Sequence, residues 1–120
     1  MTNHGRVRPG ATLEFYFDTF TGSTGAPCTI TNFAVGDIQI YKDGSTTQRA
    51  STSGFTLLDT DGVDFDSITG IQGFSVDTSD NTTAGFYAAG SRYHVVVSTI
   101  TVDGQAMSFN AGWFKIGIEG

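Results

Sequence analysis

Residues 85–118 read GFYAAGSRYHVVVSTITVDGQAMSFNAGWFKIGI and predict a long antiparallel hairpin that closes at Asp103 and Gly104. An Asp-Gly pair between two β-rich runs is a strong hairpin signal, because both central positions of a type I′ turn need a positive φ. The run before the turn, Tyr93–Val102, is dense in Val, Thr, Ile and Tyr, which fit a pleated and half-buried surface. We therefore expect this hairpin to form the central strand pair of an all-β domain.

The second strand of this hairpin changes its apolar face part of the way along. The apolar set is first Met107, Phe109 and Ala111, and then, shifted by one residue, Phe114, Ile116 and Ile118. A shift of one residue turns side chains to the wrong face of a sheet unless the backbone absorbs it. We expect a β-bulge at Gly112, beside Trp113, to do so.

The composition of this 120-residue chain indicates one all-β domain rather than a helical protein. Sixteen Gly and ten Phe accompany only three Leu, whereas helices bury Leu-rich stripes with a period of 3.6 residues. Turn signals recur at the spacing typical of a β-sandwich or barrel. We expect seven or eight strands in residues 11–120. Those before the hairpin are Thr12–Phe20, Cys28–Phe33, Asp37–Lys42, Thr46–Ser51, Phe55–Leu58 and Ile71–Val76.

The charge of the chain argues against a nucleic-acid partner. The formal net charge is −6, and six Lys and Arg are spread along the sequence, whereas phosphate binding needs a basic face. Cys28 is the single cysteine, which is compatible with folding in a reducing cytoplasm. The first ten residues have no apolar leader segment, and no run approaches membrane-spanning length. We expect a soluble chain without a membrane partner.

Residues 1–10, MTNHGRVRPG, predict a flexible basic arm outside the sandwich. His4, Arg6 and Arg8 put positive charge at one end of an acidic molecule, where they could lie on an acidic neighbour. They are the interface residues that we expect, and a frayed terminus is the alternative. On this hypothesis, deletion of residues 1–10 weakens assembly and leaves the isolated fold intact.

The densest group of carboxylates lies in LDTDGVDFD, residues 58–66, and contains Asp59, Asp61, Asp64 and Asp66. Carboxylates two residues apart in a loop can converge on Ca²⁺, which takes six to eight oxygen ligands. The spacing departs from the twelve-residue calcium loop, however, and Asp is common in turns for its own hydrogen bonds. We interpret these residues as turn acids, with a cation site as the alternative, and expect no cofactor.

No pattern of catalytic residues is found in the sequence. No serine lies in a Gly-x-Ser-x-Gly elbow, and a triad would have to use His4 or His94. His94 lies within a predicted strand, and Cys28 has no basic neighbour in sequence. A zinc site would need clustered His and Cys, and the two His and one Cys of this chain are far apart in the sequence. We expect a protein that is not an enzyme.

Exposed aromatic residues offer a binding function instead. Tyr16, Tyr41, Tyr87, Tyr93 and Trp113 could include a stacking patch for sugar rings, although sheet aromatics more often pack in a core.

Four stretches share the order of features of a known family. They are RPGATLEFYFDTFTGSTGAP (8–27), DIQIYKDGS (37–45), GIQGFSVDTSDNTTAGFYAAGSRYHVVVSTITVDGQ (70–105) and SFNAGWFKI (108–116). Together they resemble the N-terminal immunoglobulin-like module of phage baseplate upper proteins and related modules of tailed-phage virion proteins. The most specific part is the Asp-x-x-x-Asn-x-x-x-Gly-x-Tyr run from Asp77 to Tyr87, a corner that a Tyr hydroxyl could brace. The resemblance implies an immunoglobulin-like antiparallel β-sandwich and supplies no catalytic residues.

The resemblance also implies a place in a virus particle. We expect a non-enzymatic structural protein of a tailed-phage virion, either a head decoration or cement protein or a small tail or baseplate component. Its expected partners are the major capsid protein or tail and baseplate proteins, and other copies of itself in a homo-oligomer, assembled in the host cytoplasm. The alternative is a carbohydrate- or receptor-binding attachment module.

Overall fold

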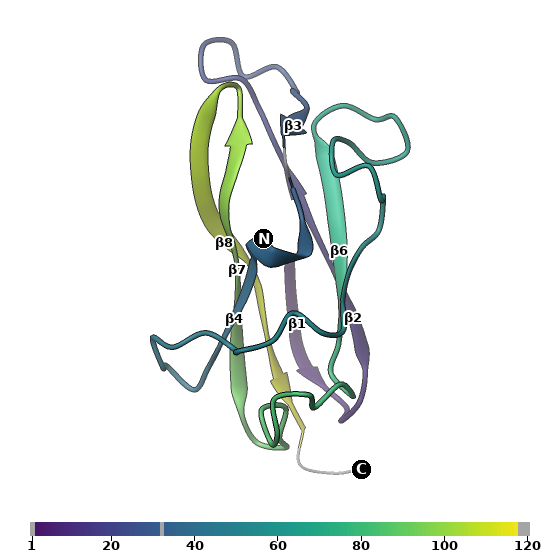
Figure 1. Cartoon of the computed structure of the whole chain (residues 1–120), viewed down its shortest axis with the longest axis vertical. Coiled ribbons are helices and arrows are strands. Elements are labelled where there is room, and N and C mark those ends of the chain that lie inside the picture. Colours follow the sequence, from purple (N-terminus) through teal and green to yellow (C-terminus); the bar gives the residue numbers. More distant parts are fainter. Residues whose placement is uncertain (1, 32, 118–120) are drawn as a thin grey trace.

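The computed structural model describes residues 2–31 and 33–117, which form eight strands in two packed sheets (Figure 1). The larger sheet contains β1 (Thr2–Val7), β8 (Gln105–Ile116) and β7 (Arg92–Val102) in that order, and both β3 (Ile30–Thr31) and β4 (Ile38–Lys42) pair with β7. The smaller sheet has the order β2 (Thr12–Asp18), β6 (Ile71–Asp77) and β5 (Phe55–Leu57). A short 3-10 turn, η1 (Val35–Asp37), connects β3 to β4. The predicted all-β sandwich is confirmed.

The strand order matches the immunoglobulin arrangement in both sheets. The neighbours β2, β6 and β5 correspond to strands B, E and D of that fold, and β4, β7 and β8 correspond to C, F and G. β1 departs from the antiparallel rule, since its strand pairing is with β8, in parallel, and not with β2. The first strand therefore extends the larger sheet.

The β7–β8 hairpin closes where the sequence predicts. Asp103 and Gly104 both have positive φ, of 50° and 73°, as a type I′ turn requires. Val102 pairs with Gln105 on either side of the turn. The predicted central strand pair is thus confirmed, with β1 on one side of it and β3 and β4 on the other.

A bulge in β8 lets the apolar side chains on both sides of it point into the core. Val95 pairs with Gly112 and Val96 with Asn110, so Ala111 is the extra residue. The predicted bulge is confirmed one position before Gly112, and it brings both Ala111 and Phe114 into the core. Of the other residues in the predicted apolar set, Met107 is exposed and Ile118 lies outside the described residues.

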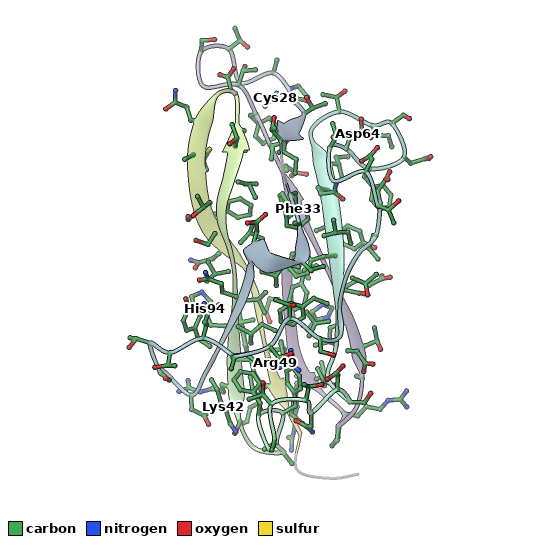
Figure 2. The ribbon with its side chains drawn as sticks, in the orientation of Figure 1. Cys28, Phe33, Lys42, Arg49, Asp64 and His94 are labelled. Carbon is green, nitrogen blue, oxygen red and sulfur yellow. The ribbon has the colours of Figure 1, made fainter. Side chains whose placement is uncertain are left out.

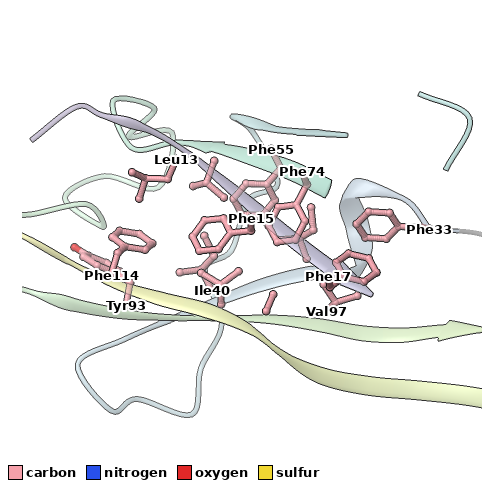
Figure 3. Packing of buried hydrophobic residues seen from close by; sticks show 14 of the residues in the cluster. Leu13, Phe15, Phe17, Phe33, Ile40, Phe55, Phe74, Tyr93, Val97 and Phe114 are labelled. Carbon is pink, nitrogen blue, oxygen red and sulfur yellow. The ribbon is translucent and has the colours of Figure 1, made fainter. Parts of the chain in front are cut away.

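Aromatic rings fill the space between the two sheets (Figure 3). Phe15 of β2 and Phe74 of β6 stack with ring centroids 5.3 Å apart, and Tyr93 of β7 stacks on Phe114 of β8 at 4.8 Å. The rings of Phe15 and Phe114, with centroids 6.2 Å apart, pack against each other across the two sheets. Each of these side chains is at most 2% exposed. Alternate apolar positions of the strands β2, β4 and β6 are also buried, namely Leu13, Phe15, Phe17, Ile38, Ile40, Phe74 and Val76.

A tyrosine hydroxyl braces the turn before β7, but it belongs to Tyr93 and not to Tyr87. The Tyr93 hydroxyl donates to the carbonyl of Phe86 at 2.6 Å and accepts from the amide of Ala88 at 2.7 Å. Tyr87 contributes its backbone amide, which donates to Oδ1 of Asn81 at 3.0 Å. Tyr93 lies at the start of β7, which is the strand F position of an immunoglobulin tyrosine corner.

The predicted N-terminal arm is wrong for residues 2–7, because these residues form β1. The strand pairs with β8 from Thr2↔Gly112 to Val7↔Ile116. His4 packs edge-on against Phe15, with ring centroids 4.9 Å apart, and its Nε2 donates to the carbonyl of Glu14 at 2.6 Å. Few apolar side chains occur here, so the sequence shows no strand pattern, and the pairing depends on the open edge of β8.

Two other predicted strands are shorter than expected. The return strand expected at Cys28–Phe33 is limited to Ile30–Thr31 among the described residues. The polar edge strand expected at Thr46–Ser51 is a single bridge, Tyr41↔Gln48. Phe65 is half-buried against Tyr16, with ring centroids 6.1 Å apart.

Candidate functional site

The outer face of the larger sheet carries a row of three rings. Tyr41 of β4 pairs with His94 of β7, and His94 pairs with Trp113 of β8, so register places the three residues side by side across three strands. They line an open depression of about 400 Å³, together with Asp43 and Arg92. Trp113 is 37% exposed, although it is the largest apolar side chain of the protein. This aromatic row is available for contact with a partner.

Hydrogen bonds hold two of the three rings of the aromatic row, those of Tyr41 and His94, in place. His94 Nε2 and Oδ1 of Asn110 lie 2.7 Å apart. The Tyr41 hydroxyl donates to Oε1 of Gln39 at 2.6 Å, and the Tyr41 and His94 ring centroids are 6.3 Å apart. Rings that are fixed before binding lose little conformational entropy when a partner covers them. Figure 2 shows His94 on the outer side of the sheet, away from the core.

A row of cations lies next to the aromatic row on the same face. Arg92 of β7 pairs with Lys115 of β8, and Lys115 pairs with Arg6 of β1. Each of the three side chains is exposed. Arg92 lies two residues before His94 in β7, and Lys115 lies two residues after Trp113 in β8. In β1, Arg6 lies three residues after Asn3, which is the partner of Trp113. The single ion pair within residues 2–31 and 33–117 is Arg49–Asp80, so no carboxylate forms an ion pair with the cation row there. Asp43 is the acidic residue that lines the depression beside Arg92.

The turn after β4 closes one side of this face. The Arg92 amide donates to Oδ1 of Asp43 at 2.9 Å, and the Asp43 amide donates to the Arg92 carbonyl at 2.9 Å. The hydrogen bond from the Arg92 amide holds the pKa of Asp43 below its usual value, with help from the Ser91 side chain. Asp43 therefore stays ionised and fixes the Asp43-Gly44 turn against β7.

The sequence-predicted interface residues separate in the structure. Arg6 belongs to the cation row, whereas His4 is turned toward β2 and bonds the Glu14 carbonyl. Arg8 is exposed and follows the end of β1, where its carbonyl accepts from the amide of Ala11 at 3.3 Å. Only Arg6 lies on the candidate face.

The predicted acidic segment forms a set of capped turns. One carboxylate oxygen each from Asp59, Asp61 and Asp64 lies within 4.8 Å of the others, and Asp66 is not part of this group. Asp59 Oδ2 accepts from the amide of Asp66 at 2.8 Å, and Asp61 Oδ1 accepts from the amide of Val63 at 2.9 Å. These bonds are the local function of Asp in turns.

Arg49 is a charged residue that sequence reasoning missed. Its side chain is fully buried, and its guanidinium donates to the carbonyls of Ser51 (2.7 Å), Ser53 (2.8 Å) and Asp80 (2.9 Å). The ring of Tyr87 lies 5.1 Å from the guanidinium carbon. The surrounding residues, TTQRASTS, are polar, so nothing in the pattern marked the position as buried.

The two histidines form hydrogen bonds to a side-chain amide and to a backbone carbonyl. His94 bonds Asn110, and His4 bonds a backbone carbonyl. Within the described ranges, neither ring bonds a serine hydroxyl or the Cys28 thiol.

The fold and this face define a small two-sheet β-sandwich with a polar and aromatic sheet surface. Comparison of the chain with protein-family models, curated proteins and solved structures found no match in any of the three. The described part of the chain contains no helix that is long and apolar enough to cross a membrane.

Proposed function

We propose that this chain is a non-enzymatic structural protein of a tailed-phage particle. It serves as a head decoration or cement protein, or as a small tail or baseplate component, and it docks on neighbouring virion proteins through the outer face of its larger sheet. The attribution to a phage particle comes from the sequence resemblance. The docking role comes from the aromatic row and the cation row on one exposed face.

The observation that carries the docking role is the exposure of Trp113 beside Arg92. Trp, Tyr and Arg are the residues that dominate binding energy at protein interfaces, because they bury large areas and still form polar contacts. A standard interface covers about 800 Å² per partner, which is roughly one eighth of the 6297 Å² surface of this chain. The outer face of one sheet supplies that area without any change of fold.

Incorporation into particles tests this proposal. Trp113→Ala should reduce the number of copies in purified particles at least tenfold, measured by quantitative mass spectrometry. Tyr16→Ala is the matched control, because Tyr16 is a 41% exposed aromatic on the smaller sheet, and it should leave the copy number unchanged. Both variants are first checked for wild-type thermal melting. Absence of the wild-type chain from particles, or equal incorporation of both variants, would overturn the proposal.

The second candidate function is carbohydrate or receptor attachment. It is favoured by the open depression between Tyr41 and Trp113, since exposed rings stack on the apolar faces of sugars. Trp113 is the single tryptophan, so its fluorescence reports on this site alone. A shift of its emission on titration with a glycan at millimolar levels, together with a handful of copies at the tail tip, would favour attachment. Hundreds of copies per particle and no glycan response would favour decoration.

A further inference from the structure

We propose that the aromatic and cation rows bind the opposite end of a second copy of this chain, so that copies associate head to tail. This inference rests on the docking face of the proposed function and names its occupant. It follows from the way charge is distributed along the molecule, which measures 46 × 27 × 22 Å.

All positive charge lies toward one end of the long axis. The six Lys and Arg are Arg6, Arg8, Lys42, Arg49, Arg92 and Lys115. Arg6, Lys115 and Arg92 form the cation row, Lys42 pairs with Tyr93 next to that row, and Arg8 follows β1. In Figure 2, Lys42 and Arg49 lie near the lower end of the molecule and Asp64 near the upper end. The sequence order gives no hint of this segregation, because these cations come from five separate segments.

The other end of the molecule combines carboxylates with exposed apolar side chains. We call it the acidic end, and it comprises the end of β2, the loop before β6 and the tip of the β7–β8 hairpin. Its acidic residues are Asp18, Asp59, Asp61, Asp64, Asp66 and Asp103. Its exposed apolar residues are Phe20 (52%), Val63 (39%), Ile68 (49%) and Met107 (43%). No Lys or Arg occurs in these segments.

The two surfaces are complementary in both kinds of contact. Trp113 and Tyr41 offer apolar area beside three cations, and the acidic end offers apolar side chains among carboxylates. Oppositely charged patches that meet across an interface favour encounter and fix orientation. A two-fold dimer would instead place the cation row against itself, which costs free energy because like charges repel. Unlike patches make a head-to-tail contact, which generates a ring or a filament.

The cation row also costs the isolated chain stability, and an acidic occupant would remove that cost. Like charges directly opposite each other on neighbouring strands are destabilising. Arg92, Lys115 and Arg6 occupy such positions on three adjacent strands of a chain whose net charge is −6. Acidic side chains are the commonest charged residues of this protein, but none forms an ion pair with the row within the described residues. A second copy supplies the missing carboxylates.

A charge-swap experiment on the purified full chain tests the inference. Sedimentation velocity over a concentration series should show species larger than the 12.7 kDa monomer at low salt, and monomer at high salt, because salt screens exposed charges. The variant R92E/K115E reverses the docking face, and D18K/D66K reverses the acidic end. We expect each variant alone to associate at least tenfold more weakly than the wild-type chain.

An equimolar mixture of the two variants gives the decisive result. The reversed face of one variant fits the reversed end of the other, and the two unreversed surfaces still fit each other, so the mixture should regain association. A discrete mass indicates a ring, and a mass that rises with concentration indicates a filament; either supports the inference. A wild-type chain that is monomeric at all concentrations, or a mixture that fails to associate while each variant melts as the wild-type chain does, overturns it.

The outcome is separable from that of the proposed function. A chain that enters particles through Trp113 but stays monomeric when purified retains the function and loses the self-association. A chain that self-associates but is absent from particles does the reverse. If a reversed variant fails to fold, R92Q/K115Q gives the same test of the face with less repulsion, and its weaker association and reduced salt dependence are the expected result.

Discussion

Arg49 and Asp80 form the one ion pair of the described chain, with Nη2 and Oδ1 3.4 Å apart, and the Arg49 side chain is completely buried. The same guanidinium donates hydrogen bonds to three backbone carbonyls in two loops. It therefore joins the segment before β5 to the segment after β6. Phe55 and Tyr87 lie over its faces, with centroids 5.3 Å and 5.1 Å from the guanidinium carbon. This pair holds one end of the sandwich together.

Arg49→Ala should therefore lower the free energy of unfolding by about 3 kcal/mol, because it leaves three loop carbonyls without their donor and removes the packing of the buried guanidinium against the Phe55 and Tyr87 rings. Arg49→Lys keeps the charge but loses the planar fork, and it should recover less than half of that loss. Arg8→Ala is the control, since Arg8 is exposed. Urea denaturation measures all three. A loss for Arg49→Ala no greater than that of the control would contradict the structural role.

The lowered pKa of Asp80 predicts how the free energy of unfolding falls at acid pH. Hydrogen bonds from the Thr82 side chain, then from Ser53 and from the Thr82 amide, lower the pKa of Asp80 from 3.8 to about 2. Because the unfolded state takes up the proton first as pH falls, this contribution is complete above about pH 3.8 and is lost toward about pH 2. Asp80→Asn should flatten the stability curve in that window. Urea denaturation of the wild-type chain and this variant at a series of pH values measures the slope, and an unchanged slope for Asp80→Asn would contradict this role.

Tyr93 and Tyr87 give a matched pair of hydroxyl deletions. The Tyr93 hydroxyl bonds the Phe86 carbonyl and the Ala88 amide, so Tyr93→Phe should cost about 1–3 kcal/mol through the groups it leaves unbonded. The Tyr87 hydroxyl is buried without a hydrogen-bond partner among the described residues, and its burial raises the pKa of that phenol. Tyr87→Phe should therefore be neutral or stabilising. Equal losses in thermal melts of the two variants would contradict the tyrosine corner at Tyr93.

Gly112 has no room for a side chain. A Cβ there would lie 2.8 Å from Cδ1 of the buried Phe15 ring and would also meet the Thr2 carbonyl of β1. Gly112→Ala should destabilise the fold by about 1–3 kcal/mol through overpacking. Gly36→Ala is the control, because no heavy atom lies within 4 Å of its added Cβ. In chemical denaturation, the free energies of unfolding of the two variants should differ by most of the loss expected for Gly112→Ala.

Deletion of residues 2–8 separates a paired first strand from a loose arm. Because β1 pairs along β8 and His4 covers Phe15, the deletion should lower stability by at least about 2 kcal/mol. It should also increase exchange of the amides of β8 that face β1. A deletion variant with wild-type stability would restore the interpretation of this segment as an arm. The replacement of His4 by Ala alone should cost less than the deletion.

The strand pattern of this protein was readable because it is local. Alternation at Leu13, Phe15 and Phe17, and the Asp103-Gly104 turn, depend on neighbours within one or two residues. The same reasoning placed the bulge near Gly112, since a change of face within one strand needs a local irregularity. It failed for β1, whose residues have no alternating apolar pattern and whose pairing with β8 spans more than a hundred positions of sequence.

By itself, the sequence determined two stacked sheets, the central hairpin and an acidic chain with capped turns, because alternation, turn chemistry and charge are properties of short segments. Only the tertiary structure decided that Arg49 is buried, that Tyr93 rather than Tyr87 braces the corner, and that Arg6, Lys115 and Arg92 share one row. The physical reason is register: which side chains meet across strands depends on the pairing of segments far apart in the chain, and no short segment encodes that pairing.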